Sequence, residues 1–230
     1  MKKLSIAIDG PAGAGKSSVS KILSARLGYA YLDTGAMYRA VTYIALSRHL
    51  ETEADIAEMA HAIHMEVRPG SDGMHVIVDG EDVTSHLRTP EVSAHVSWVS
   101  AIGPVRTALV RIQRQQAEKG GIVLDGRDIG TAVLPKADVK IFLTASVHTR
   151  AVRRFAEITK EHPEMDLAAV EKEIERRDHL DSTRAVSPLK KAEDAVLLDN
   201  GDLTLEETAE KMISVCREKF PGFDQAEGNV

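Results

Sequence analysis

The motif Gly10-Pro-Ala-Gly-Ala-Gly15-Lys16-Ser17 constrains the fold more than any other stretch of this chain. It follows the apolar run Leu4–Ile8 and matches the pattern G-x-x-x-x-G-K-[ST], which joins a buried strand to the start of a helix. Glycines let backbone N–H groups converge on phosphate oxygens there, and the helix N-terminus adds partial positive charge. The motif therefore predicts an α/β fold that binds the phosphates of a nucleoside triphosphate.

Each residue of this phosphate loop has an expected role. Lys16 is expected to reach the β and γ phosphates, and the hydroxyl of Ser17 to ligate Mg²⁺. Asp125 ends a later apolar run as a Walker-B carboxylate does, which makes it a candidate to contact the ligands of the metal. The remaining expected ATP-binding positions of the loop are Gly10, Pro11, Ala12, Gly13, Ala14, Gly15 and Ser18.

Apolar runs that are typical of buried strands alternate with helix-like segments along the chain. This alternation predicts a parallel sheet that is covered by helices on both faces. The expected strands are Leu4–Ile8, Tyr29–Leu32, Ile122–Leu124, Val139–Leu143 and Ala195–Leu198. Helix starts are expected at Thr89-Pro90, Ser146, Asp166 and the capping box of Thr204 and Glu207, and the segment Pro104–Lys119 is expected to end at Gly120-Gly121.

Residues 65–88 break this alternation. Short β-like runs are separated there by Pro69-Gly70, Asp72-Gly73 and Asp79-Gly80, which are residue pairs typical of hairpin turns. We therefore expect a small antiparallel insert on the α/β core. Residues 221–230 are expected to fray.

The composition limits the classes of function. A net charge of −6 and a pI near 5.9 argue against binding to nucleic acid or an anionic membrane, and the lack of a long apolar run indicates a cytoplasmic protein. Ten of the sixteen arginines nevertheless lie between Arg106 and Arg184, which favours a local pocket for a small anion. Cys216 is the one cysteine and is interpreted as structural, and His61 and His64 lack a third metal ligand nearby.

Two classes of protein compete for the fate of the γ-phosphate: a phosphoryl transferase and a GTPase-like switch or ATP-driven binding module. The Asn-Lys-x-Asp and Asp-x-x-Gly motifs of a GTPase do not occur in the sequence. A transferase requires a second anion site whose cations follow the moving charge. The transferase hypothesis therefore depends on polar residues outside the phosphate loop.

Residues after the second and third predicted strands are candidates for this second site. Thr34 begins a helix that carries Tyr38 and Arg39 one turn later. Arg127 and Asp128 follow a strand at its carboxyl end, where α/β sheets bind ligands, although a surface ion pair between the two is an equally simple interpretation.

Two arginine-rich helical segments are further candidates. Arg177, Asp181 and Arg184 share one helix face if the helix continues that far, and an ion-pair ladder within the helix is the alternative. Arg150, Arg153 and Arg154 are expected to stack on one face before a polar, proline-interrupted segment that has the composition of a flap. A solvated surface is the alternative for these three.

The sequence resembles the bacterial cytidylate kinases over essentially its whole length. The segments that carry the resemblance are IAIDGPAGAGKSS, LDTGAMYRAV, EVSAHVSWVSAIGPVR, VLDGRDIGTAV, KIFLTAS and RDHLDSTRAVSPL, in that order. The resemblance implies a monomeric enzyme that transfers a phosphoryl group from Mg-ATP to CMP or dCMP. It also implies a five-stranded parallel core (1–33 and 101–230), a monophosphate-binding domain (34–100) that contains the insert, and a short lid near 153–166.

The same resemblance assigns roles to residues by matching motifs. Thr34, Arg39 and Arg127 are expected around the acceptor phosphate with Tyr38 nearby, and Arg177 and Arg184 beside the transferred group. Arg150 is expected to bind ATP, and Arg154 to act in catalysis as a lid arginine that follows the migrating charge. Ser97, Arg106 and Asp128 are expected to bind the cytosine edge, and Asp181 the ribose hydroxyls. Uracil has a carbonyl where cytosine has its amine, so partial discrimination against UMP is expected. A shikimate-like or UMP-preferring kinase is the alternative, although the glycine-rich acceptor motif of shikimate kinases is missing.

Overall fold

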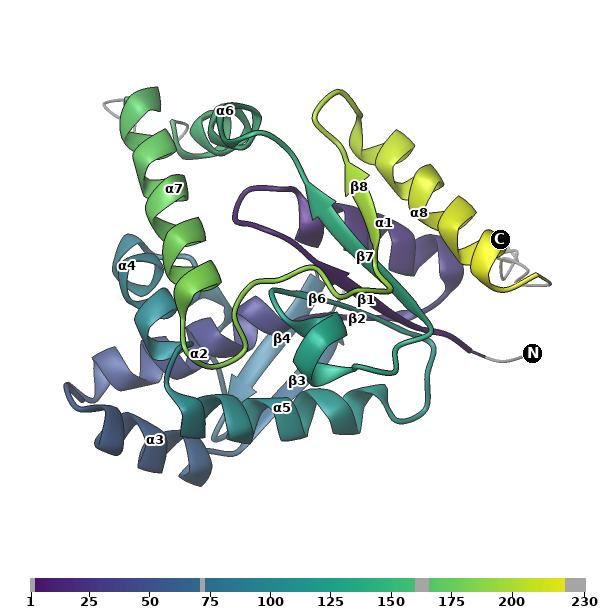
Figure 1. The fold of residues 1–230 in the computed structure, drawn as a ribbon. Helices are drawn as coiled ribbons and strands as arrows, with labels where there is room; N and C mark the ends of the chain where they lie inside the picture. Colours follow the sequence, from purple (N-terminus) through teal and green to yellow (C-terminus); the bar gives the residue numbers. More distant parts are fainter. Residues whose placement is uncertain (1–2, 71–72, 160–165, 222–230) are drawn as a thin grey trace.

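A five-stranded parallel sheet forms the centre of the molecule (Figure 1). The computed structural model describes residues 3–70, 73–159 and 166–221. The strand order is β2-β6-β1-β7-β8, and all neighbouring strands are parallel. The strands are β1 (Ser5–Asp9), β2 (Ala30–Asp33), β6 (Ile122–Gly126), β7 (Val139–Thr144) and β8 (Val196–Asp199). The five strands expected from the sequence are all present.

Helices cover both faces of the sheet, as the alternation predicts. One face carries α1 (Lys16–Leu27) and α8 (Leu205–Lys219), and the other carries α2 (Thr34–Ser47), α3 (Glu53–Ala62) and α5 (Gly103–Ala117). Side chains of β1 alternate between the two layers: Ile6 and Ile8 join the cluster with α1 and α8, whereas Ala7 joins the cluster with α2 and α5. Cys216 of α8 is fully buried in the first cluster.

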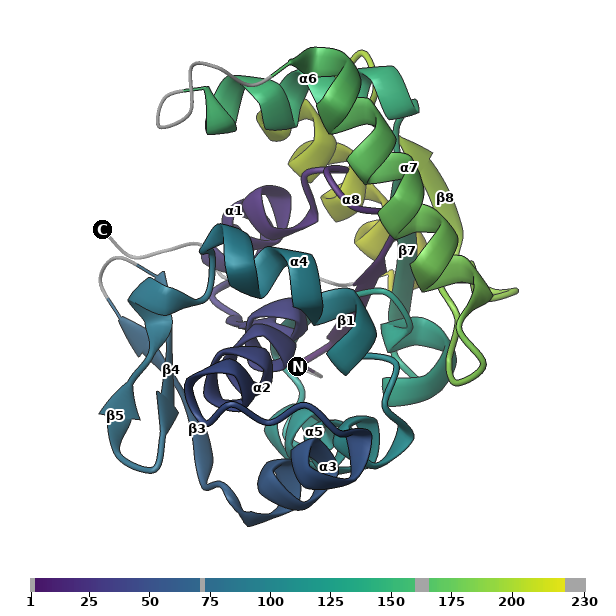
Figure 2. The same ribbon diagram turned by 90° about the vertical axis from the view of Figure 1, so that its left-hand side faces the viewer.

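The predicted antiparallel insert is confirmed as a three-stranded sheet of β3 (Met65–Gly70), β4 (Gly73–Val78) and β5 (Glu81–Asp82), followed by the short helix η1 (Thr84–His86). Asp79 and Gly80 join β4 to β5 with φ values of 52° and 89°, the positive angles that a tight hairpin turn requires. The first turn includes residues 71–72, which lie outside the described residues. Figure 2 shows this sheet beside α2.

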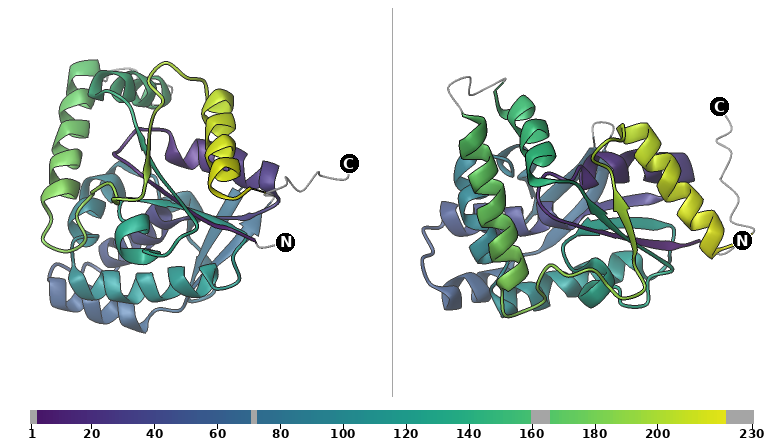
Figure 3. Two further views of the ribbon diagram at one scale, coloured as in Figure 1. Left: turned by 45° about the vertical axis from the view of Figure 1, so that its right-hand side comes forward. Right: turned by 45° about the horizontal axis from the view of Figure 1, so that its top comes forward.

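Three helices lie beyond the carboxyl ends of the strands: α4 (Pro90–Val99), α6 (Val147–Ile158) and α7 (Leu167–Thr183). Figure 3 shows α6 and α7, in teal and green, packed side by side. The caps expected at Thr89, Ser146 and Thr204 are confirmed, and Thr204 forms the full capping box with Glu207. Asp166 does precede α7, but its side chain accepts no capping hydrogen bond.

Parts of the expected lid and of the expected frayed C-terminal end fall outside the described residues. Residues 160–165 of the expected lid and residues 222–230 of the expected frayed end lie outside the described residues. The long segment before Gly120 ends its helix at Ala117, close to the expected boundary.

Within the described ranges, no helix is long and apolar enough to cross a bilayer, and no group of three or more His, Cys, Asp or Glu side chains is arranged to hold a metal.

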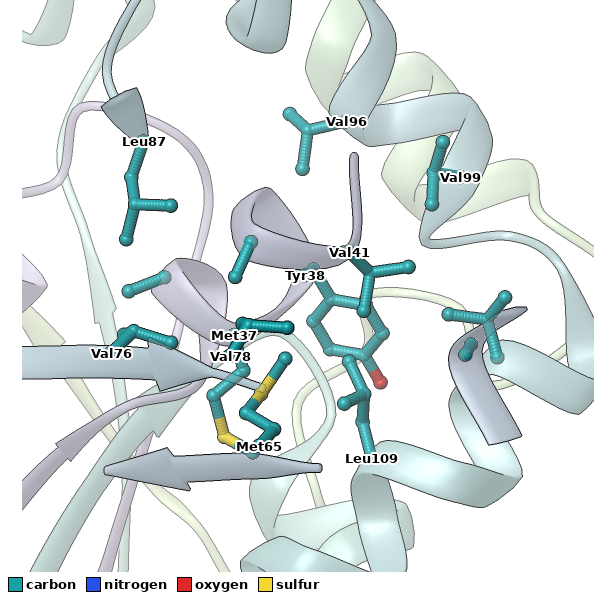
Figure 4. Packing of buried hydrophobic residues seen from close by; sticks show 14 of the residues in the cluster. Met37, Tyr38, Val41, Met65, Val76, Val78, Leu87, Val96, Val99 and Leu109 are labelled. Atoms are coloured by element: carbon teal, nitrogen blue, oxygen red, sulfur yellow. The ribbon is translucent and has the colours of Figure 1, made fainter. Parts of the chain in front are cut away.

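Leu109 of α5 tests the packing between α5 and α2. It is 1% exposed and lies against the ring of Tyr38 near Val41 (Figure 4). We expect Leu109→Ala to lower the free energy of unfolding by about 3 kcal/mol, because the substitution leaves a cavity in a closed cluster. Urea denaturation measures this change. Leu197→Ala, at a β8 side chain that is 59% exposed, is the control, and an equal loss in both variants would contradict this description of the core.

Candidate active site

The phosphate loop joins β1 to α1 with a backbone that only glycine accommodates at two points. A Cβ atom at Gly10 would lie 2.0 Å from the carbonyl oxygen of Leu143 on the neighbouring strand. Gly13 has a φ of 74°, in the left-handed region that favours glycine. The loop therefore lies pressed against β7, and its backbone amides lead directly into the N-terminus of α1.

Side chains from three distant segments hold this loop in place. The Arg150 guanidinium donates a 2.8 Å hydrogen bond to the carbonyl of Ala12 and forms a 2.7 Å ion pair with Asp178 of α7. Asp178 in turn accepts from the backbone N–H of Ala12 at 3.3 Å. Asn200, which follows β8, donates to the carbonyl of Ala14 at 3.0 Å and is itself held by Arg153.

These contacts change how the arginines of α6 are understood. Arg150 binds the loop backbone, Arg153 binds the Asn200 segment, and Arg154 pairs with Glu157 at the surface. All three arginines lie on α6 at the i, i+3 and i+4 spacing of one helix face, as expected, and from this face their guanidinium groups reach three different partners. Asn200 and Asp178 were not anticipated as site residues; the position of Asn200 at the carboxyl end of an apolar strand is the sequence signal that identifies it.

Lys16 lies inside the loop. Its ammonium group donates to the carbonyls of Gly10 and Pro11 at 2.8 and 2.7 Å, and the residue is 6% exposed. Burial, together with the nearby Arg127, lowers the pKa of Lys16. A phosphate group would reverse this effect, because its negative charge compensates the buried cation.

Ser17 and Asp125 lie together, as the sequence predicts. The Ser17 hydroxyl donates to one carboxylate oxygen of Asp125 at 3.0 Å, and Tyr31 of β2 donates to the other at 2.9 Å. Burial and the neighbouring Asp33 carboxylate raise the pKa of Asp125. A hydroxyl and carboxylates form the oxygen donor set that suits a hard divalent cation. Tyr31 was not anticipated here.

A second polar centre is built around Asp128, which is 4% exposed. Its carboxylate pairs with Arg106 of α5 and, at 3.2 Å, with Arg184. The Arg106 guanidinium also lies 5.4 Å from the ring centre of Tyr38 and donates to the carbonyl of Ser100. A surface ion pair between Arg127 and Asp128 is therefore not what forms, because Asp128 has other, buried partners.

Arg127 pairs instead with Asp181 of α7, at 2.7 Å from its Nε to the carboxylate. The helix ends at Thr183, so Arg184 lies just past it and does not continue the helical face expected for Arg177, Asp181 and Arg184. Asp128 and Asp181 therefore bind arginines from other elements, and the alternative of an ion-pair ladder of Arg177, Asp181 and Arg184 within α7 is not what forms. Burial acts to raise the pKa of Asp181, but the ion pair with Arg127 outweighs this effect and holds the pKa below its usual value.

The arginines near α2 repel one another. Arg39 donates to the carbonyl of Leu87 and to the hydroxyl of Ser93, and it adjoins a pocket of about 140 Å³ between α2 and the β insert. Burial and the neighbouring Arg177 and Arg88 lower the pKa of Arg39 to about 9. Burial and Arg127 likewise lower the pKa of Arg177. A polyanion placed here would relieve this repulsion.

Thr34 has a structural contact at this edge. Its hydroxyl donates to the carbonyl of Asp125 at 2.7 Å, and the residue is 2% exposed. This bond ties the start of α2 to the end of β6. Its expected contact with an acceptor phosphate therefore stays a prediction.

Several buried polar atoms close to these ion pairs have no hydrogen-bond partner among the described residues: Ser97 Oγ, Arg106 Nε and Arg177 Nε. Buried polar groups are nearly always satisfied in folded proteins. Unpaired donors and acceptors on α4, α5 and α7 thus indicate that a polar ligand completes the site.

A phosphate loop that faces a second, arginine-rich site at the same sheet edge defines the class of the protein: a P-loop kinase for a small anionic acceptor. The model of the family Cytidylate kinase matches residues 6–218. The chain belongs to this family.

Individual relatives cover almost the full length of the chain. It is 49% identical over 226 residues to the cytidylate kinase of Enterococcus faecalis, covering 97% of this chain and 99% of the relative. It is 50% identical over 220 residues to the cytidylate kinase of Bacillus subtilis, covering 95% and 98%. A crystal structure of an uncharacterized protein from Eubacterium ventriosum shares the fold at 14% identity, with a TM-score of 0.50 and coverage of 93% and 97%.

Removal of Arg106 tests how much the buried ion pairs stabilise the fold. We expect Arg106→Met to lower the free energy of unfolding by about 3 kcal/mol, because Asp128 stays buried with only Arg184 as its partner. Arg111→Met is the matched control, since Arg111 is exposed on the same helix. Equal stability of the two variants in urea denaturation without nucleotide would show that the pair contributes no net stability.

Proposed function

We propose that the protein transfers the γ-phosphoryl group of ATP to CMP or dCMP and releases ADP with CDP or dCDP. The observation that carries this proposal is the buried Asp128 between Arg106 and Arg184, with Ser97 Oγ and Arg106 Nε left without partners nearby. Cytosine offers an N4 amine as donor and O2 and N3 as acceptors. A carboxylate, a guanidinium and a hydroxyl complement these groups.

The transfer is direct and in line. Arg39 and Arg127 bind the acceptor phosphate, and Arg177 and Arg184 neutralise charge on the group in transfer, while Lys16 follows the β and γ phosphates of ATP. The acceptor phosphate is already an anion near pH 7, so no general base is required. Positioning and charge stabilisation supply most of the rate. Asp181 holds the ribose hydroxyls in addition to Arg127.

Magnesium bound to the phosphates of ATP belongs to this proposal. The Ser17 hydroxyl would ligate it, and Asp125, 3.0 Å from that hydroxyl, would orient the other ligands. A divalent cation supplies charge neutralisation between the β and γ phosphates. Tyr31 keeps the Asp125 carboxylate in place by its hydrogen bond.

We further propose that one chain is sufficient for activity and that the enzyme works in the cytoplasm, where its nucleotide substrates are. The resemblance to the cytidylate kinases supports both parts of this proposal. In this proposal residues 34–100 form the acceptor domain, residues 1–33 and 101–230 form the core, and the segment near 153–166 closes over ATP to exclude water.

An acceptor panel tests the proposed reaction. The purified protein with Mg-ATP is expected to form ADP rapidly with CMP and dCMP and slowly with UMP, and hardly at all with AMP, dTMP, shikimate or no acceptor. Lys16→Ala is expected to abolish turnover with the fold intact, whereas Lys211→Ala, at an exposed position of α8, is expected to retain it. ADP release that is independent of any acceptor would support the ATP-driven switch, and preference for UMP or shikimate would support the alternative kinases.

Asp128 tests base recognition separately from phosphoryl transfer. We expect Asp128→Asn to reduce the ratio of kcat/KM for CMP to that for UMP by about tenfold to a hundredfold, the range for one base-specific hydrogen-bonding group. The reason is that the Asn amide donates to the uracil carbonyl as well as it accepts from the cytosine amine. Asp202→Asn, at an exposed residue, is the control. An unchanged ratio would mean that another residue reads the base.

A further inference from the structure

Asp9 is a buried carboxylate to which neither the phosphate loop nor the acceptor site assigns a role. It ends β1, directly before Gly10, and is 4% exposed. Its two oxygens accept hydrogen bonds from the backbone N–H groups of Ile129 and Gly130, each at 2.7 Å. Both oxygens are therefore used, and both bind the same short segment.

That segment directly follows the two acceptor-site residues Arg127 and Asp128. Ile129–Val133 forms one turn of π-helix, and Asp128 is the residue that precedes it. The carbonyl of Asp128 accepts from the amides of Ala132 and Val133 at 2.8 and 3.1 Å. The backbone of Asp128 is thus fixed by this turn, and the first two amides of the turn are fixed by Asp9.

Gly130 allows the close approach of the two segments. A Cβ atom at this position would lie 3.3 Å from Asp9 Oδ2 and 3.1 Å from the Cδ atom of Lys140. Lys140 is itself held by Asp194 and by the carbonyl of Pro135, so it has little freedom to move. The turn at Gly130 is therefore confined between Asp9 and Lys140.

An ionised carboxylate is electrostatically unfavourable at this buried position. Burial raises the pKa of Asp9 to about 6, and the nearby Asp128 carboxylate acts in the same direction, against the two amides and Lys16. Ile6, Ala7 and Ile8, which precede it in β1, are apolar and buried, so the position is one where an apolar side chain would pack without this penalty. In return, the carboxylate provides hydrogen-bond acceptors for the backbone N–H groups of Ile129 and Gly130.

We propose that Asp9 is a positioning residue that fixes the distance between the donor and acceptor sites. Its backbone begins the phosphate loop, and its carboxylate anchors the segment that presents Arg127 and Asp128. An in-line transfer depends on placing the acceptor within a fraction of an ångström of the γ-phosphate. This inference rests on the proposed function, because it takes Arg127 and Asp128 as the residues that bind the acceptor.

Asp9→Asn is the test, since it keeps the size of the side chain but turns one of the two acceptors into a donor that faces an N–H group. We expect KM for CMP to rise about tenfold, the effect of one charge-assisted hydrogen bond, with a smaller change in KM for ATP. We also expect the ratio of kcat/KM for CMP to that for UMP to fall severalfold. A merely structural loss would lower the active fraction equally for both acceptors and leave this ratio unchanged.

The matched control is Asp138→Asn. Asp138 also accepts from a backbone N–H of β1, that of Ser5 at 2.9 Å, but at the end of the strand away from the site. This control is expected to keep the wild-type CMP to UMP ratio. If Asp9→Asn does not fold, Gly130→Ala disturbs the same contact without a change of charge and is expected to lower the ratio in the same way.

The outcomes separate this inference from the proposed function. If Asp128→Asn relaxes selectivity while Asp9→Asn and Gly130→Ala retain it, Asp9 has no positioning role and the proposed function stands. If Asp128→Asn also has no effect on selectivity, the assignment of the acceptor site itself is wrong. A lowered ratio in the Asp9 variant together with an unchanged ratio in the Asp138 variant supports the positioning role.

Discussion

The pairing of charges buried at the carboxyl edge of the sheet is the interaction on which the rest of the site depends. A buried ion without a partner is destabilising by several kcal/mol, and three of the acidic groups here meet a cation from another element. Asp128 joins α5 to the segment after α7, Asp181 joins α7 to the end of β6, and Asp178 joins α7 to α6 and the phosphate loop. The ion pairs therefore define where the outer helices stand relative to the strands.

The same region holds more positive than negative charge, and this excess favours the binding of anions. Arg39 and Arg177 have guanidinium groups whose pKa is lowered by burial and by other arginines, and Lys16 is affected in the same way. Such an arrangement is electrostatically unfavourable until anions bind. Bound phosphate groups would supply the negative charges that compensate these cations. The overall net charge of −6 conceals this local excess, which the distribution of arginines along the sequence indicates.

The sequence predicts the strands, the insert and the phosphate loop well because each depends on local patterns. Apolar runs mark the strands, and Asp79-Gly80 marks a turn. What it predicts poorly are partners across elements: Arg127 is next to Asp128 in sequence but pairs with Asp181. The one-turn π-helix after Asp128 has no sequence signal of its own. Asn200 was also missed, although it follows the carboxyl end of a strand, where ligand sites form, and Tyr31 was missed because it lies within β2.

Helix α7 connects the two halves of the site more directly than the sheet does. Within about one turn it carries Asp178, which binds the phosphate loop, and Asp181, which binds Arg127. Arg177, next to Asp178 in sequence, is a buried cation near Arg127 and Asp181. Because a helix moves as a rigid element, a shift of α7 that improves its contact with the phosphate loop also moves the partner of Arg127. The phosphate loop and Arg127 are therefore mechanically linked through one short stretch of helix.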